Sequence, residues 1–254
     1  AASSAVLLSA FFGLDDALPL MASRVICEGA AGKDGMPVVF SHELNVQTVQ
    51  PGDFKITAAS GSVGKVTCLT LAPADDPGEL RTVLLIGQYG SMHDQPETVE
   101  IVGNVLSKDN SLNFKGASVA VTPLKNGPSL VAAELVPQTE WMLDHPGTTL
   151  PFGGGTGCPT GTRQVLRVTW EGGVTKPNGK DADAVERDLY EVTYELATGS
   201  TNTRAPFALA DLGDGDNNHK LCLNSEDDVK AVSFPAGRLT DPRNDPNPTT
   251  SVSL

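Results

Sequence analysis

The chain has 254 residues and a formal net charge of −13, and the acidic excess is spread over both halves. An evenly acidic surface argues against nucleic acid and anionic membranes as partners, because both bind through basic patches. The length is enough for one large domain or two of common size, each with its own hydrophobic core.

No segment approaches the roughly 20 apolar residues of a membrane-spanning helix. The apolar stretch at residues 5–14 is too short to span a membrane, and we predict that it is a strand of the mature protein. The Ala-Ala start fits a signal peptide that has already been cleaved after a small residue. The alternative, a leftover signal segment, is disfavoured because Asp15 and Asp16 follow at once.

Short runs of alternating apolar residues, separated by Gly, Pro and Asn, predict many strands and almost no helix. The stretch 81–88 (RTVLLIGQ) is nearly all apolar, which predicts a strand buried on both faces. The short, charged segment 181–189 is the best helical candidate and equally fits a hairpin loop. The predicted strands are 4–12, 24–28, 36–42, 52–58, 63–71, 81–88, 98–105, 118–123, 129–136, 164–170, 189–196, 207–210, 220–223, 229–234 and 251–254.

The strand pattern breaks after Glu140, where a Gly-rich stretch containing PFGGGTGCPTGT has little to bury. We therefore predict an all-β chain of two β-sandwich domains, residues 1–140 and 164–254, joined by a flexible linker at 141–163. In the second domain Leu166, Val168 and Trp170 alternate with polar neighbours, so Trp170 is expected to fill that core.

Four cysteines are present, two in each half of the chain, and none forms a Cys-x-x-Cys pair. A thiolate metal site is therefore weakly supported. Of the three possible connectivities, the simplest joins Cys27 to Cys68 and Cys158 to Cys222. The composition favours these disulfides and an extracellular location over four free thiols in a reducing compartment.

Two segments resemble bacterial Ig-like domains of secreted and surface proteins. Residues 36–61 share an apolar strand ending in Phe40-Ser41, then Thr48-Val49, Asp53-Phe54 and Ser60-Gly61. Residues 232–248 resemble the end of such domains, with Asp245 where the family usually has Gly. The resemblance implies two Ig-like β-sandwich domains in tandem and, because most of the family are spacers and adhesin modules, a non-catalytic role.

The most promising chemistry lies in the loop between two short predicted strands, 207–210 and 220–223. Oxygen-rich side chains crowd this loop, and glycines permit tight curvature, which is the donor set that Ca²⁺ prefers. The alternative is a solvated hairpin tip, since the same residue types form turns. Asp241 and Asp245 are secondary candidates. The predicted Ca²⁺ ligands are Asp211, Asp214, Asp216, Asn217 and Asn218.

Other chemistries have little support in the sequence. The histidines lie far apart, without a His-x-His or His-Glu-x-x-His pair, so a histidine metal site is not expected. No Gly-x-Ser-x-Gly elbow marks a nucleophile, and the Gly-rich run at 153–161 lacks the Gly-Lys-Ser/Thr of a phosphate loop. We expect no catalytic residues and no cofactor other than Ca²⁺. The four histidines are His42, His93, His145 and His219.

The sequence therefore predicts a secreted or cell-surface β-sandwich protein that binds or supports other molecules without catalysis and that Ca²⁺ stabilises. Its expected partners are a protein or glycan at a surface, or further copies of itself. A first alternative is a self-assembling fibre or sheath subunit that exchanges its N-terminal strand, residues 5–12, with a neighbour. A second alternative is a secreted hydrolase on a β-sandwich scaffold, which would need two convergent carboxylates or a His-acid pair.

Overall fold

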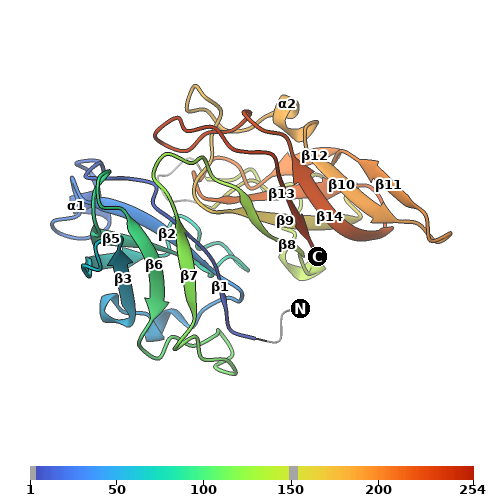
Figure 1. The fold of residues 1–254 in the computed structure, drawn as a ribbon. Helices are drawn as coiled ribbons and strands as arrows, with labels where there is room; N and C mark the ends of the chain where they lie inside the picture. Colours follow the sequence, from blue (N-terminus) through green and yellow to red (C-terminus); the bar gives the residue numbers. More distant parts are fainter. Residues whose placement is uncertain (1–3, 149–153) are drawn as a thin grey trace. The chain divides into compact units, whose positions relative to one another are not determined.

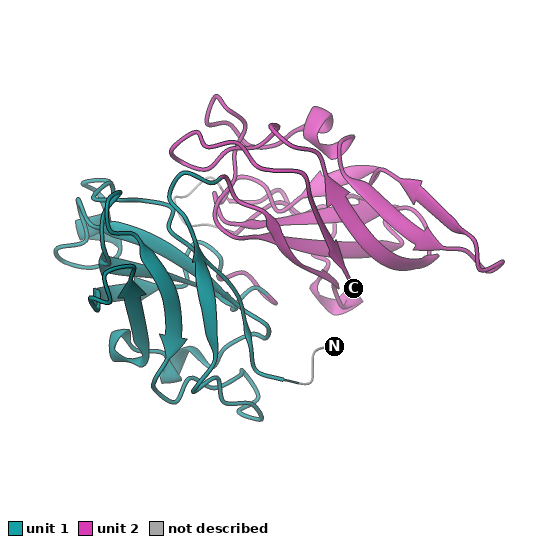
Figure 2. Cartoon of the chain, in the orientation of Figure 1, with its two compact units in different colours: residues 1–74, 79–126 teal, residues 75–78, 127–254 magenta. Residues whose placement is uncertain are grey.

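The computed structural model describes residues 4–148 and 154–254 (Figure 1). Strands supply nearly all of the regular structure, which confirms the all-β prediction. The chain forms two compact units, shown in different colours in Figure 2. Unit 1 comprises Ala1–Ala74 and Glu79–Asn126, and unit 2 comprises Asp75–Gly78 and Gly127–Leu254.

Unit 1 is built on a seven-stranded sheet in the order β3-β6-β7-β1-β2-β5-β4. The edge strands β3 and β4 are consecutive in the chain. The amide of Gly64, just before β4, donates to the carbonyl of Ile56 in β3 at 2.8 Å, so the sheet curls towards closure around its core. The strands are β1 (Leu7–Phe11), β2 (Asp34–Phe40), β3 (Phe54–Ala58), β4 (Lys65–Thr70), β5 (Thr82–Gln88), β6 (Pro96–Ile101) and β7 (Ser118–Thr122).

Strand β5 is buried on both faces, as its apolar sequence predicts. Val83 and Leu85 point into the main core of unit 1, whereas Leu84 and Ile86 pack against a smaller apolar cluster on the other face. That second cluster is covered by the segment around α1 (Ala22–Val25), which the disulfide Cys27–Cys68 ties to β4. The prediction of a strand at 24–28 is wrong, because this stretch forms a single helical turn.

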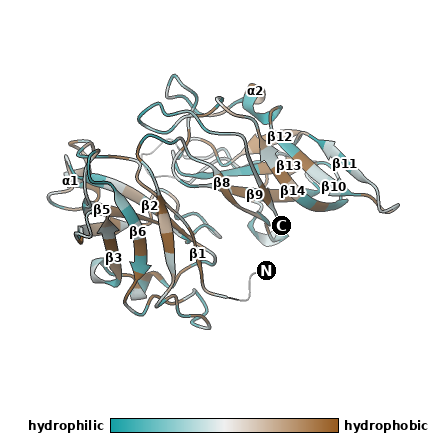
Figure 3. Ribbon diagram, in the orientation of Figure 1, coloured by the Kyte–Doolittle hydropathy of each residue, from teal (hydrophilic) through white to brown (hydrophobic). Residues whose placement is uncertain are grey.

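Unit 2 is a β-sandwich of two four-stranded sheets, in the orders β11-β10-β14-β15 and β12-β13-β9-β8. Apolar side chains from both sheets form one core between them. The strands, whose hydrophobic bands are visible in Figure 3, are β8 (Leu130–Leu135), β9 (Gln164–Trp170), β10 (Glu191–Glu195), β11 (Thr201–Arg204), β12 (Ala208–Ala210), β13 (Asn218–Leu223), β14 (Asp228–Phe234) and β15 (Thr250–Ser253).

Trp170 lies at the centre of this core, as predicted. Its ring is fully buried and meets Phe234 edge to face, with ring centroids 5.4 Å apart. Its indole N–H donates to the Tyr190 hydroxyl at 3.1 Å, so the polar atom of the indole is satisfied inside the core. The helical candidate at 181–189 holds one helical turn, α2 (Ala184–Arg187), whose first turn is closed by a capping box between Asp183 and Glu186.

The sequence placed the domain boundary at Glu140, whereas the structure divides the chain at Asn126 and Gly127. Strand β8 pairs with β9 and therefore belongs to unit 2. The described parts of the expected linker, 141–148 and 154–163, also belong to unit 2. They cover the outer face of the sheet β12-β13-β9-β8, where Cys158 is disulfide-bonded to Cys222 of β13. Residues 149–153, which include the first glycine of the Gly-rich run, lie outside the described residues.

The predicted N-terminal strand is β1, and it lies in the middle of its sheet. It pairs with β2 in antiparallel and with β7 in parallel orientation. Exchange of this strand with a neighbour would remove it from two sets of ladder hydrogen bonds. Self-assembly by exchange of this strand, in which a neighbour's copy would restore those hydrogen bonds, stays a prediction. Within the described residues, the structure has no helix with the length and apolar character needed to cross a membrane.

Phe40 allows a direct test of the unit 1 core. Its ring is fully buried and contacts Phe114 and Phe54 edge to face, with ring centroids 5.0 and 6.3 Å apart. We expect Phe40→Ala to lower the free energy of unfolding by about 3–5 kcal/mol, because it removes apolar contacts and leaves a cavity. Urea denaturation measures this loss. A change below about 1 kcal/mol, typical of a surface site, would contradict the placement of Phe40.

Candidate metal centre

The loop between β12 and β13 begins at Asp211, whose backbone turns into the left-handed region with φ of 66°. This conformation ends β12, and the Asp211 carboxylate then accepts a hydrogen bond from the Lys220 ammonium at 2.8 Å. Both side chains are buried, with 0% and 4% of their surface exposed. Lys220 lies opposite Ala210 in the hairpin register, so the ion pair forms on the outer face of the sheet.

The structure separates the five predicted ligands into two groups. Asp211 and Asp214 lie together, since the charge of Asp211 acts on the carboxyl of Asp214. The other three side chains form hydrogen bonds of the hairpin itself. Asp216 accepts the backbone N–H of Asn218 at 2.8 Å, Asn218 accepts the Thr169 hydroxyl at 2.8 Å, and Asn217 donates to the Trp170 carbonyl at 2.7 Å.

A third carboxylate, Asp76, joins Asp211 and Asp214 from a segment far away in the sequence. It lies in Asp75–Gly78, which packs within unit 2. Oxygens of Asp76 and Asp211 lie within 4.8 Å of each other, and Asp76 also accepts the backbone N–H of Gly155 at 3.0 Å. No local signal in the sequence connects Asp76 with Asp211.

Arg167 of β9 positions the segment that carries Asp76. Its guanidinium donates to the carbonyls of Pro77 and Gly78, both at 3.0 Å, and to Glu134 of β8 at 3.1 Å. A Cβ on Gly78 would lie 2.7 Å from the Arg167 nitrogens, so this close approach requires glycine. A buried arginine on the sheet thus holds the Asp76 backbone by two charge-assisted hydrogen bonds.

The segment 154–157 closes over the carboxylates. Thr156 exchanges backbone hydrogen bonds with the start of the loop: its carbonyl accepts the Asp211 N–H at 2.8 Å, and its N–H donates to Leu212 at 3.1 Å. A Cβ on Gly155 would lie 2.7 Å from Oδ1 of Asp211 and 2.8 Å from Oδ2 of Asp214. The Gly-rich sequence therefore allows a close backbone approach and does not act as a free linker here.

The negative charge of this cluster of carboxylates is only partly compensated by its surroundings. Burial, together with the negative charges of Asp211 and Asp76, raises the pKa of Asp214 to about 7. Oδ2 of Asp211 and Oδ2 of Asp214 are buried and have no hydrogen-bond donor among the described residues. Carboxylate oxygens are hard ligands, so the group could hold Ca²⁺ or Mg²⁺ but offers nothing that favours a soft metal.

The secondary candidates Asp241 and Asp245 lie in the loop between β14 and β15. Oδ1 of Asp241 accepts the backbone N–H groups of Arg243 and Asp245 at 2.8 and 2.9 Å, which closes that loop on itself. In unit 1, Asp15, Asp16 and Asp34 also bring carboxylate oxygens within 4.8 Å. There Asp34 accepts the backbone N–H groups of Asp16 and Tyr89 at 2.9 and 2.7 Å, so its carboxylate braces two loops.

The His219 side chain is buried in unit 2 and lies next to the core residue Tyr190. It is 5% exposed, and its Nδ1 lies 2.8 Å from the Tyr190 hydroxyl, which also accepts the Trp170 N–H. Burial lowers the pKa of His219 to about 4, although the charge of Asp211 acts in the opposite direction. His42 contacts Ser41, and His145 contacts the backbone of Gly155, so these histidines occupy separate environments.

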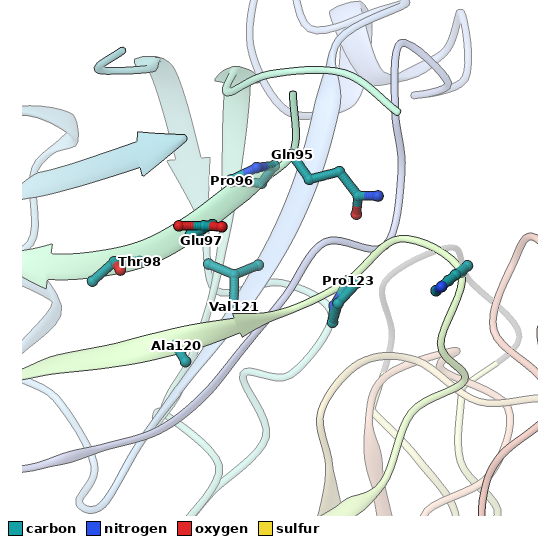
Figure 4. A pocket seen from close by; sticks show the side chains of 8 residues that line it. Gln95, Pro96, Glu97, Thr98, Ala120, Val121 and Pro123 are labelled. Atoms are coloured by element: carbon teal, nitrogen blue, oxygen red, sulfur yellow. The ribbon is translucent and has the colours of Figure 1, made fainter. Parts of the chain in front are cut away.

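The outer surface of unit 1 is hollowed between β6 and β7 (Figure 4). The hollow has a volume of about 560 Å³ and is open to solvent. Val121 and Pro96 form its apolar floor, and Glu97, Thr98 and Lys125 contribute polar groups at its rim. It lacks the aromatic platform and convergent charged groups that define a built ligand site.

Comparison with known proteins adds little. No protein-family model matches the chain, and no curated protein matches it. Among solved structures, the N-terminal part of the bacterial S-layer protein SbsC has a TM-score of 0.32 at 11% identity and covers 99% of this chain. Domains 1–6 of the same surface layer protein give 0.32 at 10% identity and cover 100%. This chain spans 44% and 40% of those two chains, and a likeness this weak carries no argument about function.

Gly155→Ala tests how tightly the segment 154–157 packs over the carboxylates. We expect a loss of about 1–3 kcal/mol in the free energy of unfolding, because the added methyl group would collide with Asp211 and Asp214. Gly52→Ala is the matched control, since a Cβ there has open space and an unstrained backbone. Chemical denaturation of both variants measures the difference. Equal stabilities would show that the segment 154–157 does not close over the carboxylates.

His219 predicts a pH dependence of stability. Its pKa in the folded protein is about 4, below the unfolded value of about 6.5, so the unfolded state binds the proton more tightly. The stabilising contribution is therefore complete above pH 6.5 and is lost as the pH falls towards 4, by on the order of 3 kcal/mol. Urea denaturation of the wild type and of His219→Gln across this range isolates the effect. Parallel curves for the two proteins would contradict a buried neutral imidazole.

Proposed function

We propose that the chain is a structural or binding module of a secreted or cell-surface protein, and that it acts through its surface and not by catalysis. The observation that carries this proposal is the pair of disulfides, Cys27–Cys68 and Cys158–Cys222, which use all four cysteines of the chain. Disulfides form and persist in oxidising compartments and are rare where thiols are kept reduced.

The positions of the disulfides support a lasting structural role. In unit 1 the bond ties the helical turn α1 to β4, and in unit 2 it ties the covering segment to β13. Each covering segment is mostly irregular and packs on a small apolar cluster of its own, so it has little else to hold it in place. Reduction would therefore loosen both covers, which suits a protein that works outside a reducing compartment.

The proposed partners are a protein or glycan at a surface, or further copies of the chain. An acidic surface with a net charge of −13 keeps such a module soluble and favours basic or neutral partners over polyanions. Strands joined by exposed loops are a common scaffold for recognition of this kind, because the sheets hold the loops in fixed positions. A stabilising cation would fit this role, but the role does not depend on it.

Localisation tests the proposal directly. An antibody raised against the folded chain should label intact cells of the producing organism or detect the protein in its medium. Extracellular protease should remove the cell-bound signal without lysis. The mass of the isolated protein should rise on reduction by the four hydrogens that two disulfides take up. A cytoplasmic protein with four free thiols would refute the proposal.

The disulfide of unit 2 should make a large contribution to stability. It closes a sequence separation of 64 residues, which corresponds to about 4 kcal/mol of loop entropy in the unfolded chain. We expect Cys158→Ser/Cys222→Ser to lose stability of this order in urea denaturation. Ser251→Ala/Ser253→Ala serves as the double-substitution control, because both serines are exposed and belong to unit 2. A loss under 1 kcal/mol would mean that the covering segment is held by its other contacts.

A further inference from the structure

The carboxylates Asp76, Asp211 and Asp214 converge from two segments, 75–78 and the loop after β12, onto the backbone of Gly154 and Gly155. A Cβ on Gly154 would lie 2.8 Å from Oδ1 of Asp76, and one on Gly155 would meet both of the other carboxylates. Asp211 is 2% exposed, so the group lies beneath the surface of unit 2. This arrangement differs from the sequence prediction, which drew every ligand from the single loop 211–218.

Two oxygens in this group point to a missing positive charge. Oδ2 of Asp211 and Oδ2 of Asp214 are buried without a hydrogen-bond donor among the described residues. Of the other carboxylate oxygens, Oδ1 of Asp211 is bound by Lys220, Oδ1 of Asp214 by the backbone N–H of Asp216, and Oδ2 of Asp76 by the backbone N–H of Gly155. An ionised carboxylate buried without a donor or a cation is costly, so these atoms require compensation.

The charge of the group indicates the kind of compensation. The ionised carboxylates of the group outnumber the single ammonium of Lys220, so the group carries a net negative charge that a cation would offset. The donors are all oxygens on irregular backbone, which suits the flexible coordination of Ca²⁺ better than the strict octahedron of Mg²⁺. Hard oxygen donors also disfavour zinc and copper, whose protein sites use histidine or cysteine.

We propose that unit 2 binds one divalent cation, with Ca²⁺ preferred over Mg²⁺, through Asp76, Asp211 and Asp214, and that the ion fastens the segments 75–78 and 154–157 to the loop after β12. Asp216, Asn217 and Asn218 shape that loop and do not ligate the ion. The inference does not rest on the proposed function, because a surface module without the ion would remain a surface module.

The test is thermal unfolding of the full disulfide-bonded chain in chelator, in millimolar CaCl₂ and in millimolar MgCl₂. Calcium should raise the unfolding midpoint by several degrees and magnesium by less, because an ion that binds only the native state stabilises it. Isothermal titration with CaCl₂ should give one ion per chain. An unchanged midpoint in both salts would overturn the proposal.

Two variants locate the ion. Asp214→Asn should unfold at or above the wild-type midpoint in chelator, because it removes an uncompensated buried charge, and it should lose the calcium-induced shift. Asp76→Asn should lose that shift as well, which separates the proposed ligand set from one within the loop. The control Asp181→Asn changes an exposed carboxylate and should keep the full shift.

A third readout needs no variant. In the wild type, amide hydrogen exchange at Gly155 and Thr156 should slow when CaCl₂ replaces the chelator, since their segment would be held by the ion. A full calcium shift in Asp214→Asn, or calcium-independent exchange at these two amides, would contradict the proposed site. Failure of these tests leaves the localisation experiment unaffected, so the two proposals can fail separately.

Discussion

In both units a sheet is buried on its two faces, and the second face is covered mainly by irregular chain. Strand β5 directs Leu85 into the main core and Ile86 into a separate cluster under α1. Strand β9 directs Leu166 into the main core of unit 2 and Val165 into a separate cluster on the other face. A second sheet can bury such a face with its own apolar side chains. A loop that covers the face brings few apolar contacts, and its backbone polar groups still need hydrogen-bond partners. The two disulfides lie at these covers, where packing alone contributes least.

The same constraint explains the polar chemistry of unit 2. Strands β9 and β13 carry Arg167 and Lys220 on the outer face, and the cover removes both from water. A buried cation must be paired, so Arg167 binds Glu134 and two backbone carbonyls, and Lys220 binds Asp211. Each of these bonds also positions part of the cover. The acidic cluster is therefore a consequence of the cover and not an independent loop motif.

The sequence predicted the features that depend on local pattern. Alternation located most strands and the core position of Trp170, and the continuous apolar run at 81–88 indicated burial on both faces. The simplest cysteine pairing is confirmed. The helical turn α1 was missed because Ile26 and Val25 suggest a strand, whereas four residues of helix leave no periodicity to detect. Strand β8 was assigned to the wrong unit, since its pairing with β9 spans an irregular segment that resembles a linker in composition.

The candidate metal centre shows the limit of local pattern more clearly. Asp211 and Asp214 could be found because they share a loop with turn-forming residues, but Asp76 reaches them only through Arg167 and Gly155. Asp216, Asn217 and Asn218 match the composition of a Ca²⁺ loop, yet the hairpin already uses their side chains. Composition therefore identifies oxygen donors, whereas their availability depends on which backbone groups remain unsatisfied after the sheet has formed.

The cation would affect the motion of the covering segments of unit 2 more than the motion of its sheets. The core between the two sheets of unit 2 contains Trp170, Tyr190 and Phe234 and does not involve the carboxylates. The segments 75–78 and 154–157, in contrast, are attached by a small number of hydrogen bonds on the outer face. Segments with few buried apolar contacts open at lower free energy than core strands. A cation at Asp76, Asp211 and Asp214 would therefore act first on local opening of the cover, and it would change which surface unit 2 presents before it changed the fold.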